Sequence, residues 1–180
     1  MSHEFLNEKE KKILDLEVRR NIYDAIKKYA GCHFREIERI SRLSTGSVKY
    51  HLDYLARCGL IRKEKARSKL RYFPRDFDSK NKTLLGALRQ QSLRNILLFI
   101  LIHEGCNHEQ IVKAVELSPS TVSWHLKMLE ANNILGFDKR GRKTFYRILV
   151  DKNQIIKLLI TYKESFLDTL VDRVVEMWDI

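Results

Sequence analysis

Apolar residues recur at helical spacing over residues 9 to 30, and Gly31 then supplies a natural helix end. A second helix is predicted from Phe34 to Ser41 by the same spacing. A third helix is predicted after Ser44, a side chain suited to capping it, and its buried stripe consists of Val48, Leu52 and Leu55. The opposite face of that helix is predicted to remain outside the core.

The apolar period changes after Gly59, from helical spacing to that of short strands. Leu60-Ile61 and the segment from Leu70 to Phe73 are predicted to form two strands on either side of a charged turn. The first part of the chain is therefore expected to be a set of helices followed by a hairpin.

The whole pattern occurs twice. When the sequence is shifted by 74 residues, the stretch from Arg20 to Tyr72 falls on the stretch from Arg94 to Tyr146 without a gap. Identities at the shifted positions include Gly31 with Gly105, Ser44 with Ser118, His51 with His125, and Leu52 with Leu126. A gapless internal repeat predicts two copies of one structural unit.

The second copy has two features of its own. Its first helix, Ile96 to Ile102, is apolar on every side and must be covered all round. The expected cover is a long C-terminal helix from Asp151 to Trp178, which carries two apolar stripes. One stripe is predicted to pack on the helix at 96 to 102. The other is predicted to meet a second copy of the chain, and folding back onto the first repeat is the alternative.

Helix, helix, turn, helix and a basic hairpin are the elements of a winged helix-turn-helix. The predicted fold class is therefore mainly α with small β wings: two tandem winged helix-turn-helix domains plus a long C-terminal helix. The predicted domains are residues 1–78, 79–150 and 151–180. Only a short polar linker, around 76 to 81, separates the repeats.

Charge favours a polyanionic partner. The 180 residues carry a net charge of +11, and the excess of basic over acidic groups lies in the repeats: 19 against 12 in residues 1–78 and 11 against 5 in residues 79–150. Nucleic acid is the partner that this predicts, with simple solubility as the alternative. Three cysteines form no disulfide framework, and the chain shows neither a signal peptide nor a membrane span, so we expect a cytoplasmic protein.

The third helix and the hairpin of each repeat supply the candidate DNA contacts. Small residues at the helix start allow close approach and offer backbone N–H groups to phosphate, polar residues in its next turn reach base edges, and hairpin cations reach phosphates. The candidates are Ser44, Thr45, Gly46, Ser47, Lys49, Tyr50, Lys65, Arg67, Lys69 and Arg71 in the first repeat, and Ser118, Pro119, Ser120, Thr121, Ser123, Trp124, Lys127, Lys139, Arg140, Arg142 and Lys143 in the second.

Two segments carry a resemblance to known proteins. Residues 43 to 52, LSTGSVKYHL, and residues 117 to 129, LSPSTVSWHLKML, resemble the motif of archaeal winged-helix regulators related to the ArsR and MarR types. Among tandem arrangements, the chain is similar to the euryarchaeal archaellum regulators. The resemblance implies a transcription regulator, activator or repressor, that binds double-stranded DNA. The basal transcription machinery is a further candidate partner, and the apolar stripes of residues 151-180 make a second copy of the chain another.

Several alternatives remain open. The chain lacks the cysteine pair of metal-sensing relatives, so Cys32, Cys58 and Cys106 are interpreted as core residues, and neither metal nor cofactor is expected. His51 and His125 either pack beneath the wing or contact DNA. The sequence contains no motif of an enzyme. A protein-docking module or a sequence-neutral architectural DNA-binding protein is the alternative function.

Overall fold

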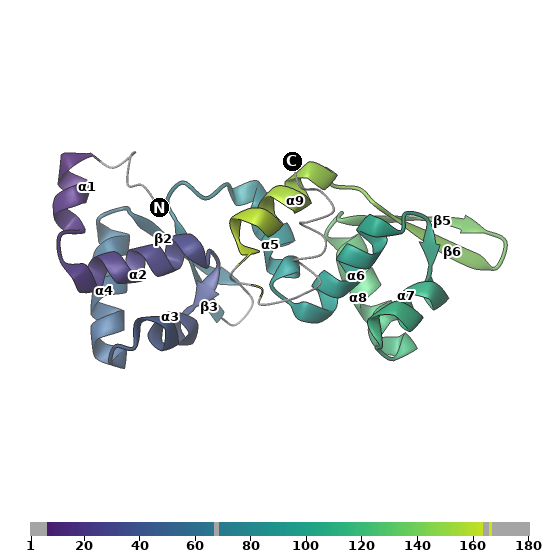
Figure 1. Cartoon of the computed structure of the whole chain (residues 1–180), viewed down its shortest axis with the longest axis horizontal. Coiled ribbons are helices and arrows are strands. Elements are labelled where there is room, and N and C mark those ends of the chain that lie inside the picture. Colours follow the sequence, from purple (N-terminus) through teal and green to yellow (C-terminus); the bar gives the residue numbers. More distant parts are fainter. Residues whose placement is uncertain (1–6, 67–68, 164–165, 167–180) are drawn as a thin grey trace. The chain divides into compact units, whose positions relative to one another are not determined.

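The computed structural model describes residues 7–66, 69–163 and 166, and the chain divides into two compact units, residues 1–79 and 80–180. Unit 1 contains α1 (Glu8–Ile13), α2 (Glu17–Lys28), β1 (Cys32–His33), α3 (Phe34–Ser41), α4 (Thr45–Arg57), β2 (Ile61–Ala66) and β3 (Lys69–Pro74) (Figure 1). Its strands form an antiparallel sheet in the order β1-β3-β2. A short 3₁₀ helix, Ser79–Asn81, follows.

Unit 2 repeats this order with α5 (Lys82–Leu88), α6 (Gln91–Ile102), β4 (Cys106–Asn107), α7 (His108–Val115), α8 (Pro119–Ala131), β5 (Leu135–Arg140) and β6 (Lys143–Ile148), and then adds α9 (Lys152–Thr161). Its sheet has the order β4-β6-β5. The hairpin of β5 and β6 extends beyond the helices of its unit (Figure 1). Both units are therefore winged helix-turn-helix folds, and the fold class is mainly helical with small sheets, as predicted.

The helix expected over residues 9 to 30 is wrong as a single element, because it is broken between Ile13 and Glu17. Arginine side chains from α2 stabilise the break: Arg19 donates to the carbonyl of Ile13 at 2.7 Å, and Arg20 to that of Leu14 at 3.0 Å. These carbonyls are freed where α1 ends, so the arginines satisfy acceptors that a helix end leaves open.

The same device recurs in unit 2, where α5 was not expected at all. Arg94, at the position equivalent to Arg20, donates to the carbonyl of Leu88 at 2.8 Å. Leu88 in turn corresponds to Leu14, and both leucines lie before the aligned stretches that begin at Arg20 and Arg94. The two units therefore share this arginine-to-carbonyl hydrogen bond as well as the aligned sequence. Arg94 is only 3% exposed, whereas Arg20 lies at the surface.

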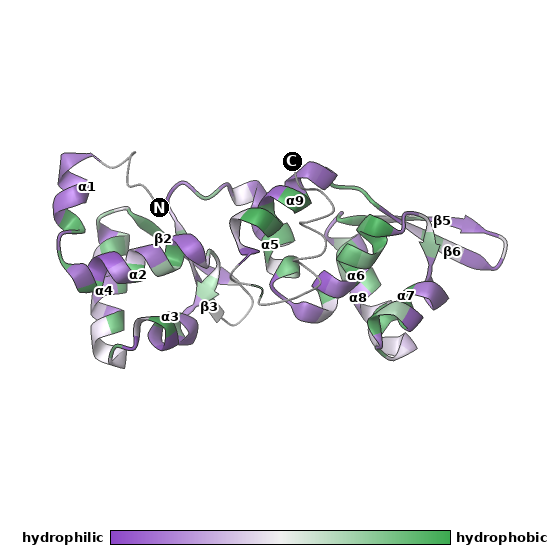
Figure 2. Cartoon of the chain, in the orientation of Figure 1, coloured by the Kyte–Doolittle hydropathy of each residue, from purple (hydrophilic) through white to green (hydrophobic). Residues whose placement is uncertain are grey.

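The apolar helix α6 is covered by several elements of unit 2, and Phe166 of the C-terminal segment contacts its Arg94. It contacts α5, α7, α8 and β6, while α9 packs on α5. The short α5 supplies the apolar cover because Leu84, Leu85 and Leu88 are all buried. Figure 2 shows the hydrophobic colouring of α6 along most of its length.

The C-terminal helix is shorter than expected. Asp151 caps α9 by accepting from the backbone N–H of Asn153 at 3.0 Å, but the helix ends at Thr161. Ile155, Ile156, Leu158 and Leu159 are buried, and Ile160 is 53% exposed. The predicted continuation toward Trp178 lies outside the described residues, apart from Phe166, whose carbonyl accepts from Arg94 at 3.5 Å. Within the described part of the chain, no helix is long and apolar enough to span a membrane.

Candidate nucleic-acid interface

The predicted third helix of each repeat is α4 in unit 1 and α8 in unit 2, and the term third helix refers to these two. Helix α4 presents a polar face because its apolar stripe lies in the core. Val48, Leu52 and Leu55 are at most 1% exposed, and α4 contacts both α2 and α3. Ser44 caps the helix by accepting from the backbone N–H of Ser47 at 3.3 Å. The candidate residues outside the core are Ser44, Thr45, Gly46, Lys49 and Tyr50, all exposed, and the half-buried Ser47.

Unit 2 builds the same face on α8. Ser118 caps the helix through the backbone N–H of Thr121 at 3.2 Å, and Pro119 occupies the first turn, in which no N–H is needed. Trp124 is 55% exposed, close to the 56% of Tyr50 at the equivalent position. Both aromatic rings lie on the outer face of their helix, as the periodicity predicted.

One contact of α8 escaped the sequence analysis. The imidazole Nε2 of His108, the first residue of α7, lies 2.8 Å from the hydroxyl of Ser123. Unit 1 has Phe34 and Lys49 at the equivalent positions. This difference between the repeats was the only sign in the sequence of a pair between His108 and Ser123.

The two hairpins carry their cations differently. In unit 2, Lys139, Arg140, Arg142 and Lys143 are all exposed around the hairpin turn. In unit 1, Lys65 is exposed, but the half-buried Arg71 donates to the carbonyl of Gly31 at 2.6 Å and so ties β3 to the end of α2. Arg67 lies outside the described residues, and for Lys69 only the backbone, in β3, is described.

A hollow of about 400 Å³ in unit 2 brings helix and hairpin residues together. Its walls include His108, Ser123, Arg142 and Lys143. Three of these side chains were expected to contact DNA, and the structure places them around one space. Glu109 also lines the hollow, so its charge is not purely basic.

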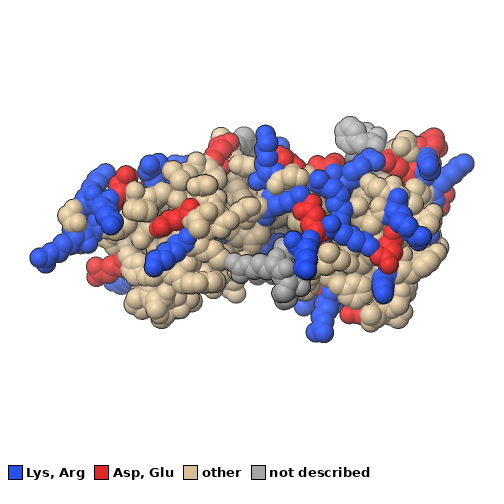
Figure 3. Space-filling model, turned by 180° about the vertical axis from the view of Figure 1, so that it is seen from behind, with Lys and Arg blue, Asp and Glu red and all other residues tan. Residues whose placement is uncertain are grey.

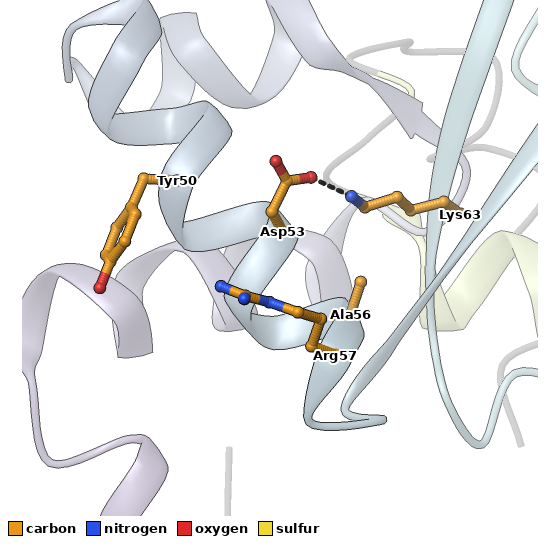
Figure 4. A pocket seen from close by; sticks show the side chains of 5 residues that line it. All are labelled: Tyr50, Asp53, Ala56, Arg57 and Lys63. Carbon is orange, nitrogen blue, oxygen red and sulfur yellow. Dashed lines mark hydrogen bonds and ion pairs between the residues drawn. The ribbon is translucent and has the colours of Figure 1, made fainter.

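Unit 1 has an open hollow of about 610 Å³ between α4 and β2, lined by Tyr50, Asp53, Ala56, Arg57 and Lys63 (Figure 4). The ammonium of Lys63 donates to the carboxylate of Asp53, which joins the hairpin strand to the third helix. This hydrogen bond lowers the pKa of the Asp53 carboxyl, and the positive charges of Lys63, Lys49 and Arg57 act in the same direction.

Basic side chains are distributed over both units and are interspersed with acidic ones. Figure 3 shows Lys and Arg across the viewed face of each unit, with Asp and Glu among them. The viewed face of each unit is thus a mixed surface of basic and acidic side chains.

The cysteines are core residues in this structure. Cys32 is fully buried and Cys106 is 4% exposed, and burial raises the pKa of the Cys106 thiol to about 11. Cys58 is half-buried. Among the described residues, no three His, Cys, Asp or Glu side chains gather as a metal site would require.

Two family models match the chain in tandem. A model described as an N-terminal HTH domain matches residues 16–85, and the model of the bacterial regulatory protein, arsR family, matches residues 91–135. An uncharacterized HTH-type transcriptional regulator of Methanocaldococcus jannaschii, MJ1398, is 30% identical over 139 residues, which are 77% of this chain and 35% of that protein. The chain thus spans about a third of the length of this relative.

Two solved structures of HlyU from Vibrio cholerae N16961, one of them of the reduced protein, also match. Each is 21% identical to this chain, covers 48% of it, and has a TM-score of 0.41. The match covers 91% of one HlyU chain and 88% of the reduced one.

His51 and His125 are buried beneath the polar faces of α4 and α8. Each is 8% exposed, and the buried Nδ1 atom of each has no hydrogen-bond partner among the residues that the structure describes. Burial lowers the pKa of both imidazoles, and for His51 the charge of Arg19 lowers it further. Of the two roles considered for these histidines, packing in the core agrees with their burial.

The buried histidines predict a pH-dependent stability. A histidine whose pKa is lower in the folded state is protonated first in the unfolded chain, which therefore binds more protons below about pH 6.5. The free energy of unfolding should thus fall as the pH is lowered from about 7 to about 5. Urea denaturation followed by tryptophan fluorescence measures this for unit 2, because both tryptophans, Trp124 and Trp178, belong to residues 80–180. His125→Gln should flatten the pH dependence and His103→Gln, at an exposed position, should not; equal pH slopes for the two variants would contradict the prediction.

Proposed function

We propose that this protein, a tandem winged helix-turn-helix regulator by its fold and its relatives, binds double-stranded DNA sequence-specifically and thereby regulates transcription. One observation carries the proposal: each unit exposes the polar face of a serine-capped third helix next to a hairpin with exposed cations. A helix of this kind fits the major groove, and the hairpin cations then meet phosphates. The fold and the relatives point to a DNA-binding regulator and away from an enzyme.

The proposed DNA contacts are of two kinds, to base edges and to the phosphate backbone. Lys49 and Tyr50 of unit 1, and Ser123 and Trp124 of unit 2, would contact base edges. The helix-capping residues and the hairpin cations are placed to bind the backbone, which positions the protein without reading sequence. Because the two helices differ in sequence, the half-sites they read should be similar but not identical. A protein bound at such a site can either contact the basal transcription machinery or exclude it.

Selection of duplexes from a random-sequence pool tests this function. Wild-type protein should enrich one sequence, and a footprint on that duplex should cover two half-sites whose centres lie about one helical turn, ~34 Å, apart. Affinity for the selected duplex should exceed that for the unselected pool at one fixed salt concentration. Equal affinities would support the architectural alternative, and no binding to either DNA would support the docking-module alternative.

The hairpin of unit 2 should supply sequence-independent affinity. Replacing Lys139, Arg140 and Arg142 together with Met should weaken binding to the selected duplex and to the pool by the same factor. The slope of log affinity against log salt should become shallower by about 0.9 for each phosphate that the hairpin no longer neutralises. Fluorescence anisotropy titrations at several salt concentrations measure both quantities. An unchanged salt slope in the triple variant would exclude the hairpin from the interface.

We further propose that the chain forms a homodimer through residues 151–180. The exposed apolar side chain of Ile160, on the outer side of α9, supports this proposal. Light scattering on the DNA-free protein should then give twice the monomer mass of 21.4 kDa. Ile160→Asp should halve the observed mass, whereas Lys157→Asp, on the same helix, should change it little. A monomer at micromolar concentration in the wild type would exclude the dimer.

A further inference from the structure

The surfaces formed by the third helix of the repeat and the first strand of its hairpin differ between the two units at two equivalent positions. The repeat aligns Asp53 with Lys127 and Lys63 with Phe137. The strand register confirms the second correspondence, because Lys63 is paired with Tyr72 in unit 1 and Phe137 with Tyr146 in unit 2. The same two places in the fold therefore carry an acid and a base in one unit, and a base and an aromatic residue in the other.

In unit 1, the ion pair of Asp53 and Lys63 leaves a carboxylate on the wall of the hollow that contains Tyr50. The side chains of Lys63 and Asp53 are 29% and 48% exposed, so the pair remains accessible to a ligand that approaches this face. Lys63 can bind a phosphate fully only by leaving Asp53, and the carboxylate would then face the DNA unpaired.

A second acid lies at the same helix of unit 1. The hydroxyl of Thr45, the first residue of α4, donates to the carboxylate of Glu38 in α3. The position equivalent to Glu38 in unit 2 is Val112. Unit 1 thus places two carboxylates along α4, although Lys49 partly offsets them, and unit 2 places none at the equivalent positions.

In unit 2, Lys127 is exposed and has no ion pair within the described ranges. Trp124, three residues before Lys127 on α8, is 55% exposed, and Phe137, the equivalent of Lys63, is 45% exposed. An exposed cation without an ion pair attracts the phosphates of any duplex, since the phosphate backbone has the same charge in every sequence.

A carboxylate at a DNA-facing surface acts in the opposite way. It repels the phosphate backbone, and it is favourable only where a base edge donates to it, as the amino group of cytosine does. An unfavourable group of this kind lowers affinity for incorrect sequences more than for the correct one, and so increases specificity.

We propose that Asp53, held by Lys63, is a specificity-determining residue of unit 1 that disfavours non-cognate DNA, and that Lys127 at the equivalent position of unit 2 binds DNA of any sequence. This inference rests on the proposed function and adds an unequal division of tasks between two copies of one fold. Both side chains are at the surface, so conservative substitutions at these positions leave the core intact.

Two neutral variants of similar size, Asp53→Asn and Lys127→Met, test the proposal by fluorescence anisotropy. The two probes are a duplex that the wild-type protein selects from a random-sequence pool and the unselected pool itself. Asp53→Asn releases Lys63 to bind one phosphate, which steepens the salt slope on the pool by about 0.9 and raises affinity about eightfold at ~0.1 M salt. Affinity for the selected duplex should rise less, so the ratio of the two affinities falls.

Lys127→Met should lower affinity for both probes by the same factor, about eightfold at ~0.1 M salt, and leave their ratio unchanged. The double variant Asp53→Asn/Lys63→Met separates the roles within the pair: affinity for the pool should return toward that of wild type, because the released cation is gone. Circular dichroism of each variant checks that the fold is retained.

The outcomes separate the inference from the function on which it rests. If the wild type binds both probes equally or neither, the proposed function fails. If the wild type prefers the selected duplex and Asp53→Asn keeps the full preference, the function stands and the role of Asp53 is wrong. A loss of preference in Lys127→Met would likewise overturn the division of tasks.

Discussion

The buried stripe of the third helix is the constraint on which the candidate interface depends. Val48, Leu52 and Leu55 in α4, and Val122, Leu126 and Leu129 in α8, are each at most 1% exposed. Burying a side chain of this size contributes about 1.5–3 kcal/mol, so rotating either helix about its axis would cost several such contributions. The orientation of the polar face is therefore set by the core, and substitutions on that face change its chemistry without changing its direction. This separation explains how two copies of one fold can carry different surface residues.

The sequence predicted those parts of the fold that depend on local periodicity. The bounds of α3 match the prediction, and α4 and α8 begin directly after their capping serines. The sequence did not predict the elements that depend on tertiary contacts. The break between α1 and α2 depends on Arg19 and Arg20 bonding to carbonyls six residues away, and β1 and β4 have only two residues each, too few to show a period. Most of the predicted contact residues lie at the surface as expected, but the side-chain pairs His108–Ser123 and Asp53–Lys63 join separate elements and have no local signature.

The comparison of the two units shows which differences the fold itself requires. Helix α2 of unit 1 is half-polar, with Asp24, Lys27 and Lys28 half-buried, whereas its counterpart α6 has an apolar residue at every position from 96 to 102. Unit 2 adds α9 after its hairpin, and Arg94, which contacts Phe166, is buried where Arg20 is exposed. Burying an arginine is costly unless its donors find acceptors, and the carbonyls of Leu88 and Phe166 accept from two of its nitrogens. The residues that unit 2 adds after its hairpin thus account for the burial of Arg94.

The differences on the polar faces have no such structural cause. The Asp53–Lys63 pair joins α4 to β2 at the surface, and an exposed ion pair of this kind stabilises a fold by at most about 1 kcal/mol. Unit 2 keeps the same helix and hairpin with Lys127 and Phe137 in these places, which shows that the fold does not need the pair. Because the stability of the fold explains neither arrangement, we look for the cause in the partner that each surface contacts. A difference in charge at equivalent positions changes the interaction energy most for a partner as highly charged as DNA.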